Sequence, residues 1–184
     1  MDGEGLLILT QRFPRYSIVV STVTAHRPYG LITRVAGEVP GYIDRGYLST
    51  VPLPESAWPR VGEQRRALVL GVTNDGRLRL DMRKDDLDLV DRAVDLPEVM
   101  SRWWAARHAE AGDEAALHRF YQCDDSALLL AWLMRGYGRG NPVKCVEVVI
   151  ETAPEGIRRR VAEELARDDL SGDPGDATSL IPLR

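Results

Sequence analysis

Five short runs rich in Val, Ile, Thr and Leu follow one another between residues 16 and 83, and glycine or proline bounds most of them. They are YSIVVSTVTAH, GLITRVAG, GYIDRGYL, RRALVLGVT and RLRLDMR. Such runs between turn-forming residues predict strands. Leu78 and Leu80 alternate with charged residues, and Asp75-Gly76 just before them is typical of a hairpin turn. Five strands in about seventy residues predict a small closed or partly open barrel, because closure hides sheet edges.

Beyond Asp85 the apolar residues recur at helical spacing. The predicted helices are EVMSRWWAARHAEAG, after a capping-box pair at Asp95 and Glu98, then EAALHRFYQ, SALLLAWLMRGYG and PEGIRRRVAEELARDD. SALLLAWLMRGYG is apolar nearly all round, so it is predicted to be the central buried helix. For residues 142–152 the sequence supports two alternatives. Asn141-Pro142 favours a helix, and the β-branched content of the segment favours a strand.

The charge changes sign along the chain. Residues 1–84 hold 12 basic and 8 acidic side chains, whereas residues 85–184 hold 12 and 20. A basic excess suits a surface that binds phosphates, and a solvated barrel surface is the alternative. The acidic second half suits a basic protein partner.

Several classes of protein are excluded or disfavoured by what the sequence contains. No apolar run is long enough to span a membrane, and we expect a cytoplasmic protein. The two cysteines have no metal-ligand spacing, and neither a phosphate-binding loop nor an HExxH motif occurs. We therefore expect no catalytic residue, no cofactor and no metal site. An acidic cluster is interpreted as a linker or helix start: Asp85, Asp86, Asp88 and Asp91.

Residues 16–84 resemble the S-one RNA-binding domain, the OB-type barrel repeated in the largest protein of the bacterial small ribosomal subunit. The shared blocks are IVVSTVTAH, the Pro-aromatic-Gly turn Pro28-Tyr29-Gly30, GYIDRGYLS, VGEQRRALVLGV and GRLRLDMRK. Their order and spacing agree with the family over a little more than a third of the chain. The resemblance does not extend to the C-terminal part. The resemblance implies that the barrel is of the OB type. With the helical pattern beyond Asp85, the expected fold is α+β, in which a small five-stranded OB-type β-barrel precedes an α-helical domain.

The expected organisation has five parts. They are an N-terminal extension or extra strand (1–15), the barrel (16–84), a linker (85–94), the helical domain (95–170) and a flexible tail rich in Gly, Ser, Asp and Pro (171–184).

The resemblance also implies an RNA-binding face on the barrel. Tyr29 stands at the family's turn aromatic, where its ring would stack on a base; rim packing is the alternative. The second family aromatic falls at Leu31 or Ile32, and the family's histidine falls at Asp44, which would repel a phosphate. Candidate replacements are Arg34, Arg45, Arg77 and Arg79, with Tyr42 and Tyr47 as further aromatic area.

For two aromatic residues outside that turn, Tyr42 and Trp58, a packing role is favoured over an RNA contact. Tyr42 stands where the family has a core leucine, so filling of the barrel is the favoured interpretation there. Trp58, in the connection between the third and fourth strands, is expected to plug one end of the barrel.

Two functions follow as hypotheses. In the first, the barrel binds single-stranded or structured RNA with little sequence preference and without chemistry, while the acidic helical domain contacts a protein partner. The candidate partner surface is Trp103, Trp104 and Tyr137, although adjacent tryptophans on a helix cannot share one face. In the second, the protein has lost RNA binding and is a protein-interaction module, such as an immunity or antitoxin protein.

Overall fold

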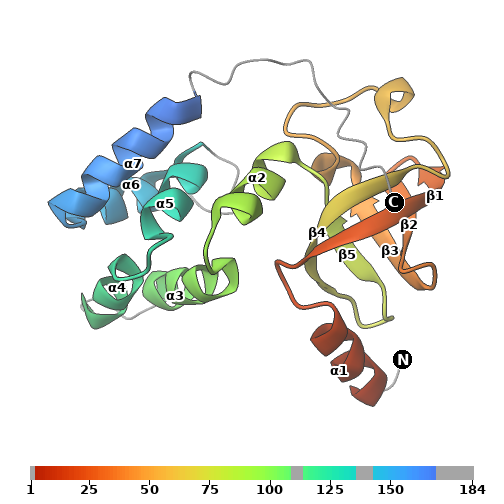
Figure 1. Ribbon diagram of the computed structural model, residues 1–184, viewed down its shortest axis with the longest axis horizontal. Coiled ribbons are helices and arrows are strands. Elements are labelled where there is room, and N and C mark those ends of the chain that lie inside the picture. Colours follow the sequence, from red (N-terminus) through yellow and green to blue (C-terminus); the bar gives the residue numbers. More distant parts are fainter. Residues whose placement is uncertain (1–2, 109–113, 136–142, 169–184) are drawn as a thin grey trace. The chain divides into compact units, whose positions relative to one another are not determined.

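The computed structural model describes residues 3–108, 114–135 and 143–168, in which one helix, a five-stranded sheet and six further helices follow one another (Figure 1). The strands are β1 (Ile18–Arg27), β2 (Gly30–Val35), β3 (Val39–Asp44), β4 (Gln64–Val72) and β5 (Leu78–Asp81). The helices are α1 (Gly3–Arg12), α2 (Lys84–Arg92), α3 (Leu96–His108), α4 (Glu114–Tyr121), α5 (Ser126–Met134), α6 (Val143–Thr152) and α7 (Glu155–Asp168).

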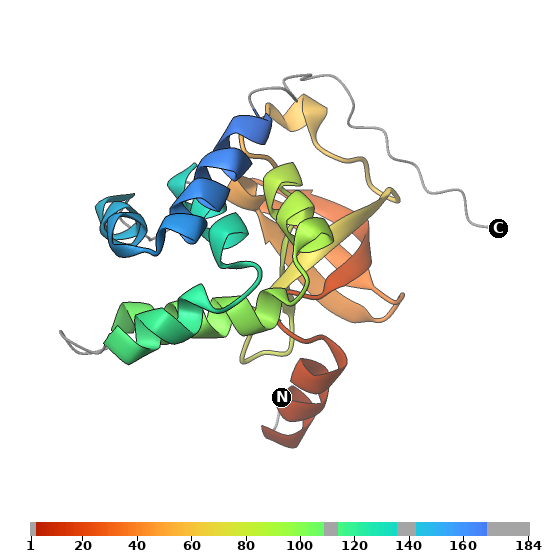
Figure 2. The same cartoon turned by 60° about the vertical axis from the view of Figure 1, so that its left-hand side comes forward.

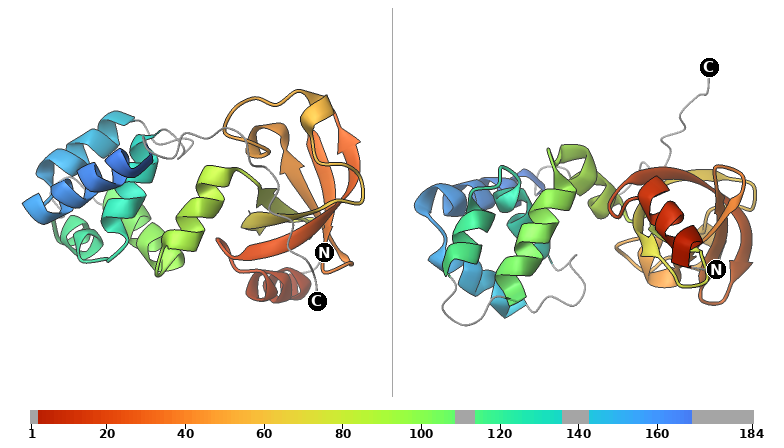
Figure 3. Two further views of the ribbon diagram at one scale, coloured as in Figure 1. Left: turned by 45° about the horizontal axis from the view of Figure 1, so that its top comes forward. Right: turned by 90° about the horizontal axis from the view of Figure 1, so that it is seen from below.

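The five strands form a closed barrel in the order β1-β2-β3-β5-β4, with β4 pairing back to β1. Neighbours are antiparallel except β3 and β5, which are parallel. Irregular register between Val23 and Ala25, and again between Val69 and Gly71, lets the long strands β1 and β4 bend around the barrel. The right panel of Figure 3 shows the strands as a ring. The predicted fold class, a five-stranded OB-type barrel followed by helices, is confirmed.

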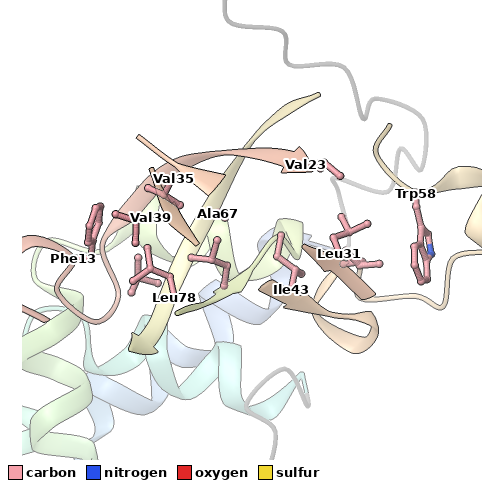
Figure 4. Close-up of a cluster of buried hydrophobic side chains, with 12 residues drawn as sticks. Phe13, Val23, Leu31, Val35, Val39, Ile43, Trp58, Ala67 and Leu78 are labelled. Carbon is pink, nitrogen blue, oxygen red and sulfur yellow. The ribbon is translucent and has the colours of Figure 1, made fainter. Parts of the chain in front are cut away.

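Alternation along each strand fills the barrel with aliphatic side chains. Leu31, Ile43 and Leu78 have no exposed surface. Two aromatic residues close the ends: Phe13 lies at one end of this core and Trp58 at the other (Figure 4). Trp58 is 5% exposed, so its predicted role as a plug is confirmed. Burying these side chains is the main favourable contribution to the barrel's stability.

The N-terminal segment is a helix, so the extra strand left open by the sequence is not formed. In the right panel of Figure 3, α1 lies across the ring of strands. Leu9 packs against the barrel core, and the backbone N–H of Phe13 donates to the Leu9 carbonyl oxygen at 2.9 Å. Leu9 on α1 and Phe13 directly after it are one turn apart, so both side chains meet the barrel core.

Gly30 is required by the turn between β1 and β2. Its φ is +145°, and a Cβ atom there would lie 2.0 Å from the carbonyl oxygen of Ile43. Neither the backbone conformation nor the space admits a side chain. The turn ending at Gly30 leaves Tyr29 at its tip with 55% of its surface exposed.

Residues 85–94, expected as a linker, lie mostly within α2. Figure 2 shows α2, in light green, beside the barrel, where it contacts β4. Arg66 of β4 donates to both carboxylate oxygens of Asp91 at 3.0 and 2.5 Å, and these hydrogen bonds lower the pKa of Asp91. The ion pair fixes one side of α2 against the strand.

The remaining helices follow the predicted segments closely. The N–H of Glu98 donates to Asp95 Oδ1 at 3.0 Å, as the capping box requires at the start of α3. In α5 seven of the nine residues are buried, which confirms the prediction of a buried helix. Residues 143–152 form helix α6, which settles the alternative in favour of a helix. Helices α5, α6 and α7 pack on one another.

The chain divides into two compact units, of which the first ends at Phe120 and the second begins at Tyr121. The division therefore falls later than the predicted linker, because α2, α3 and all of α4 except Tyr121 belong to the same unit as the barrel. The predicted tail, residues 171–184, lies outside the described residues. A bilayer would need a longer and more apolar helix than any in the described ranges.

Candidate nucleic-acid interface

Strands β2, β3 and β5 present one continuous outer face. The ladder places Ile32 opposite Tyr42, and Tyr42 opposite Arg79. In β3 the residues Val39, Gly41 and Ile43 are buried and those between them are not. Tyr42 and Asp44 therefore point outward beside the outward residues of β2 and β5.

Tyr42 does not fill the barrel, which corrects the favoured interpretation from the sequence. β3 begins at Val39, two residues before Gly41, where the sequence predicts its start. The earlier start leaves the alternation unchanged: Gly41 and Ile43 are inward and buried, so the intervening Tyr42 is half-buried on the outer face. The sequence had offered Tyr42 as an RNA contact as well, and its position is compatible with that role.

An open groove of about 530 Å³ lies on this face. Its lining comes from the β1–β2 turn, the end of β3 and the β4–β5 turn: Tyr29, Tyr42, Asp44, Thr73, Asn74, Asp75 and Arg77. The turn residues reach Tyr42 because β5 pairs with β3. The groove therefore combines two tyrosine rings with a hairpin turn rich in polar groups.

The β4–β5 turn holds a closed set of hydrogen bonds. The Thr73 hydroxyl donates to Asp75 Oδ1 at 2.5 Å, and Arg77 Nε donates to Asp75 Oδ2 at 2.7 Å. The hydrogen bond from Arg77, and then that from Thr73, lower the pKa of Asp75 to about 2. The Arg77 guanidinium also lies 5.7 Å from the centre of the Tyr42 ring. Asp75 is thus an ionised partner of Arg77, and the two charges balance inside the groove.

Asp44 has a partner that the sequence does not reveal. Arg79 Nη2 lies 3.2 Å from Asp44 Oδ2, and the Arg79 guanidinium lies 5.1 Å from the centre of the Tyr47 ring. The predicted repulsion of phosphate by Asp44 is therefore partly offset by an adjacent cation. Among Asp44, Asp75, Arg77 and Arg79 the positive and negative charges are equal in number.

Two predicted arginines keep their charge uncompensated. Arg45 is exposed, and within the described residues its side chain has no partner; its backbone N–H donates to the Tyr29 carbonyl oxygen at 2.7 Å. Arg34 Nη1 donates to the carbonyl oxygen of Glu38 at 3.1 Å and meets no carboxylate in the part of the chain that the structure describes. Both cations border the outer face without lining the groove.

Tyr47 lies apart from the groove. It belongs to a 3₁₀ turn, η1 (Arg45–Tyr47), and packs against the barrel core. The Arg83 guanidinium lies 4.9 Å from its ring centre, close to the distance found for Arg79. The geometry gives this side chain a packing role between two arginines.

A buried charged cluster stands next to Tyr47. Arg83, 7% exposed, donates from Nη2 to Asp81 Oδ2 at 2.7 Å and pairs with Asp86 Oδ2 at 2.5 Å. Burial, followed by the neighbouring Asp81, raises the pKa of Asp86 to about 8. Protonation of Asp86 would reduce the negative charge buried around the single Arg83 guanidinium. The cluster joins β5 to the first turn of α2.

The acidic cluster on α2 is engaged by basic or hydroxyl groups. Lys84 Nζ lies 2.6 Å from Asp88 Oδ2, and the Thr50 hydroxyl donates to Asp85. Over the described ranges, no group of three or more potential ligands is placed to hold a metal ion.

The three residues of the predicted partner surface, Trp103, Trp104 and Tyr137, do not form one exposed surface in the part of the chain that the structure describes. Trp103 is 1% exposed and its ring centre lies 5.5 Å from that of Phe120, so its side chain is not available to a partner. Trp104 is half-buried, stacked on His108 at 5.5 Å, with the Arg107 guanidinium 5.2 Å from its ring centre. Tyr137 lies outside the described residues.

Sequence reasoning missed Thr73, Asn74 and Asp75 as groove residues. Asp75-Gly76 was identified as a hairpin turn, but nothing local to the turn shows that it lies beside Tyr42. That neighbourhood depends on the parallel pairing of β3 with β5, which is a contact between distant parts of the chain.

The sequence matches no protein-family model and no curated protein. Among solved structures, it is similar to GSP13 from Bacillus subtilis, with 19% identity over 54% of this chain and 74% of that one and a TM-score of 0.37. The intact alpha subunit of aIF2 from Pyrococcus abyssi shares 15% identity over 82% of this chain and 60% of that one, with a TM-score of 0.36. A complex of a/eIF2alpha, aDim2p and rRNA from Pyrococcus horikoshii contains a chain with 14% identity, over 83% of this chain and 95% of that one, and a TM-score of 0.37. Because all three TM-scores are below 0.5, these similarities carry no argument about function.

Proposed function

We propose that this protein binds single-stranded RNA on the outer face of its barrel, with little sequence preference, and without a chemical step. The observation that carries the proposal is the groove in which the Tyr29 and Tyr42 rings stand together, with Arg45 exposed next to Tyr29. Aromatic rings stack on bases of any sequence, and each such contact contributes about 1–3 kcal/mol to binding. The resemblance to the S-one domain supports the same face.

The uncompensated arginines supply the phosphate contacts in this proposal. Arg34 and Arg45 border the face on which the tyrosines stand, and neither meets a carboxylate among the described residues. Cations next to stacking rings are the combination that a flexible single strand requires. Asp75 has no role as a general base in this proposal, because its low pKa makes it a weak proton acceptor.

The proposal includes a protein partner for residues 85–184, a segment that is acidic because it holds 20 acidic and 12 basic side chains. The half-buried Trp104, stacked on His108, is the candidate contact on α3.

The test is the affinity of a labelled single-stranded RNA for the intact protein at several salt concentrations. Tyr29→Ala removes a stacking ring, and Arg45→Glu reverses an unpaired charge. Arg158→Glu on α7 is the matched control, since it makes the same charge change at an exposed position far from the groove in sequence. Arg45→Glu should weaken binding and flatten the salt dependence, Tyr29→Ala should weaken binding with the salt dependence kept, and Arg158→Glu should do neither. An RNA affinity that neither Tyr29→Ala nor Arg45→Glu changes, or no binding at low salt, would contradict the proposal.

A further inference from the structure

The groove is poor in free positive charge, although it lies on the face proposed to bind RNA. Arg77 is the cation that lines it, and Asp75 engages both its Nε and Nη2 atoms. Asp44 also lines the groove, with Arg79 as its partner. A phosphate placed here would meet carboxylates at least as closely as guanidinium groups.

A nucleobase fits this lining better than a phosphate does. A base is uncharged, its ring can stack on Tyr29 or Tyr42, and its edge can pair with polar groups of the β4–β5 turn. Phosphates then lie outside the groove, on the side where Arg45 stands next to Tyr29. The structure thus separates the two kinds of contact along the face.

Asp44 has acceptor capacity to spare for such a base. A carboxylate offers about four lone-pair sites, and the contact from Arg79 is made to Oδ2. Asp75, by comparison, already accepts at both oxygens, from Thr73 and Arg77. Of the two groove carboxylates, Asp44 is the one placed to accept a hydrogen bond from a ligand.

We infer that Asp44 makes the groove selective for bases that carry an exocyclic amino group. This inference rests on the proposed function and adds to it the class of base. Cytosine presents an amino donor where uracil presents a carbonyl oxygen, and a carboxylate accepts from the first and repels the second. The two bases have the same ring size, so stacking on the tyrosines does not separate them.

The experiment compares labelled oligocytidylate and oligouridylate of equal length on the intact protein and on Asp44→Asn. The wild type should bind oligocytidylate about fivefold more tightly, at the low end of base discrimination by a side chain. Asp44→Asn keeps the shape of the side chain but removes its charge and releases Arg79. Both affinities should therefore rise while their ratio falls to within about twofold. Asp88→Asn on α2 is the control, because it makes the same charge change and should leave the ratio unaltered.

The possible outcomes separate the two proposals. If both oligomers bind equally, if oligouridylate binds better, or if Asp44→Asn keeps the wild-type ratio, the selectivity inference is wrong while RNA binding stands. If neither oligomer binds the wild type at low salt, the proposed function fails, and the selectivity fails with it. A thermal melt of each variant shows that a changed ratio comes from a folded protein.

Discussion

Arg79 and Arg83 lie over the same tyrosine ring but in opposite environments. Their guanidinium carbons are 5.1 and 4.9 Å from the centre of the Tyr47 ring. Arg79 is 43% exposed in its pair with Asp44, whereas the side chain of Arg83 is 8% exposed in its pairs with Asp81 and Asp86. A pair in water is weak and can exchange its partner for a ligand, while a buried pair cannot lose a member without a large cost. The barrel thus carries, four residues apart, an exposed pair that can change partners, Arg79 with Asp44, and a buried, fixed site, Arg83 with Asp81 and Asp86.

The largest effect is expected from Arg83→Met. The change leaves Asp81 and Asp86 buried without their guanidinium partner, and breaking a buried pair in this way costs about 3–5 kcal/mol. Chemical denaturation should show this loss in the free energy of unfolding. Should the variant be as stable as the wild type, the buried cluster would not be the fixed site described here.

Tyr47→Ala tests whether the ring links the two arginines. The change removes packing against the barrel core and two guanidinium contacts, for an expected loss of about 2–3 kcal/mol. Tyr47→Phe is the control, since it keeps the ring and should lose far less. Equal losses in the two variants would assign the effect to the hydroxyl group and contradict the role given to the ring.

The pH dependence of stability distinguishes the buried site from the exposed one. Burial and Asp81 raise the pKa of Asp86 to about 8 from its ordinary value of 3.8. The folded protein therefore holds a proton that the unfolded chain releases near pH 4, so this group's contribution to the free energy of unfolding falls from about pH 4 to about pH 8.

Asp86→Asn removes that dependence. Relative to the wild type, the variant should gain stability as the pH rises from about 4 to about 8, by a few kcal/mol in order of magnitude, because the pKa differs by about four pH units between the folded and unfolded states. Denaturation curves at pH 5 and pH 9 give the comparison. A wild type and variant with parallel pH profiles would contradict a raised pKa at Asp86.

The smallest effect is expected from Arg79→Met, which removes the exposed partner of Asp44. Because the pair is open to water, the free energy of unfolding should change by less than about 1 kcal/mol. Arg79→Met and Arg83→Met replace the same residue type by the same residue and differ only in whether the site is exposed or buried. A loss as large as that of Arg83→Met would remove the distinction between the two sites.

Local sequence patterns predicted the barrel well because each strand carries its own alternation and turn signals. RLRLDM and the Asp75-Gly76 hairpin fix β5 and its pairing with β4 without knowledge of the rest of the chain. The start of β3 was missed because Pro40 interrupts the pattern before Gly41. The side on which Tyr42 lies was predicted wrongly because the alternation of β3 puts Gly41 and Ile43, rather than Tyr42, inside the barrel.

The candidate site was less predictable than the fold because it depends on contacts between distant residues. Tyr29 stood out through the Pro-aromatic-Gly turn, and Arg45 as a basic residue within the third predicted strand, GYIDRGYL. The pairing of Asp44 with Arg79, and the approach of Asp75 to Tyr42, arise only when β5 lies beside β3. Likewise, the sequence shows Asp86 as one of four aspartates, and only the buried Arg83 sets it apart.

The central claim is that RNA lies in the groove between the β1–β2 and β4–β5 turns. The most direct measurement is a titration of ¹⁵N-labelled protein with a short oligocytidylate, following the backbone amide signals by NMR. We predict that the shifts concentrate at the residues that line the groove, which are Tyr29, Tyr42, Asp44, Thr73, Asn74, Asp75 and Arg77. Shifts confined to helices α3 to α7, or no shifts at all, would contradict the claim.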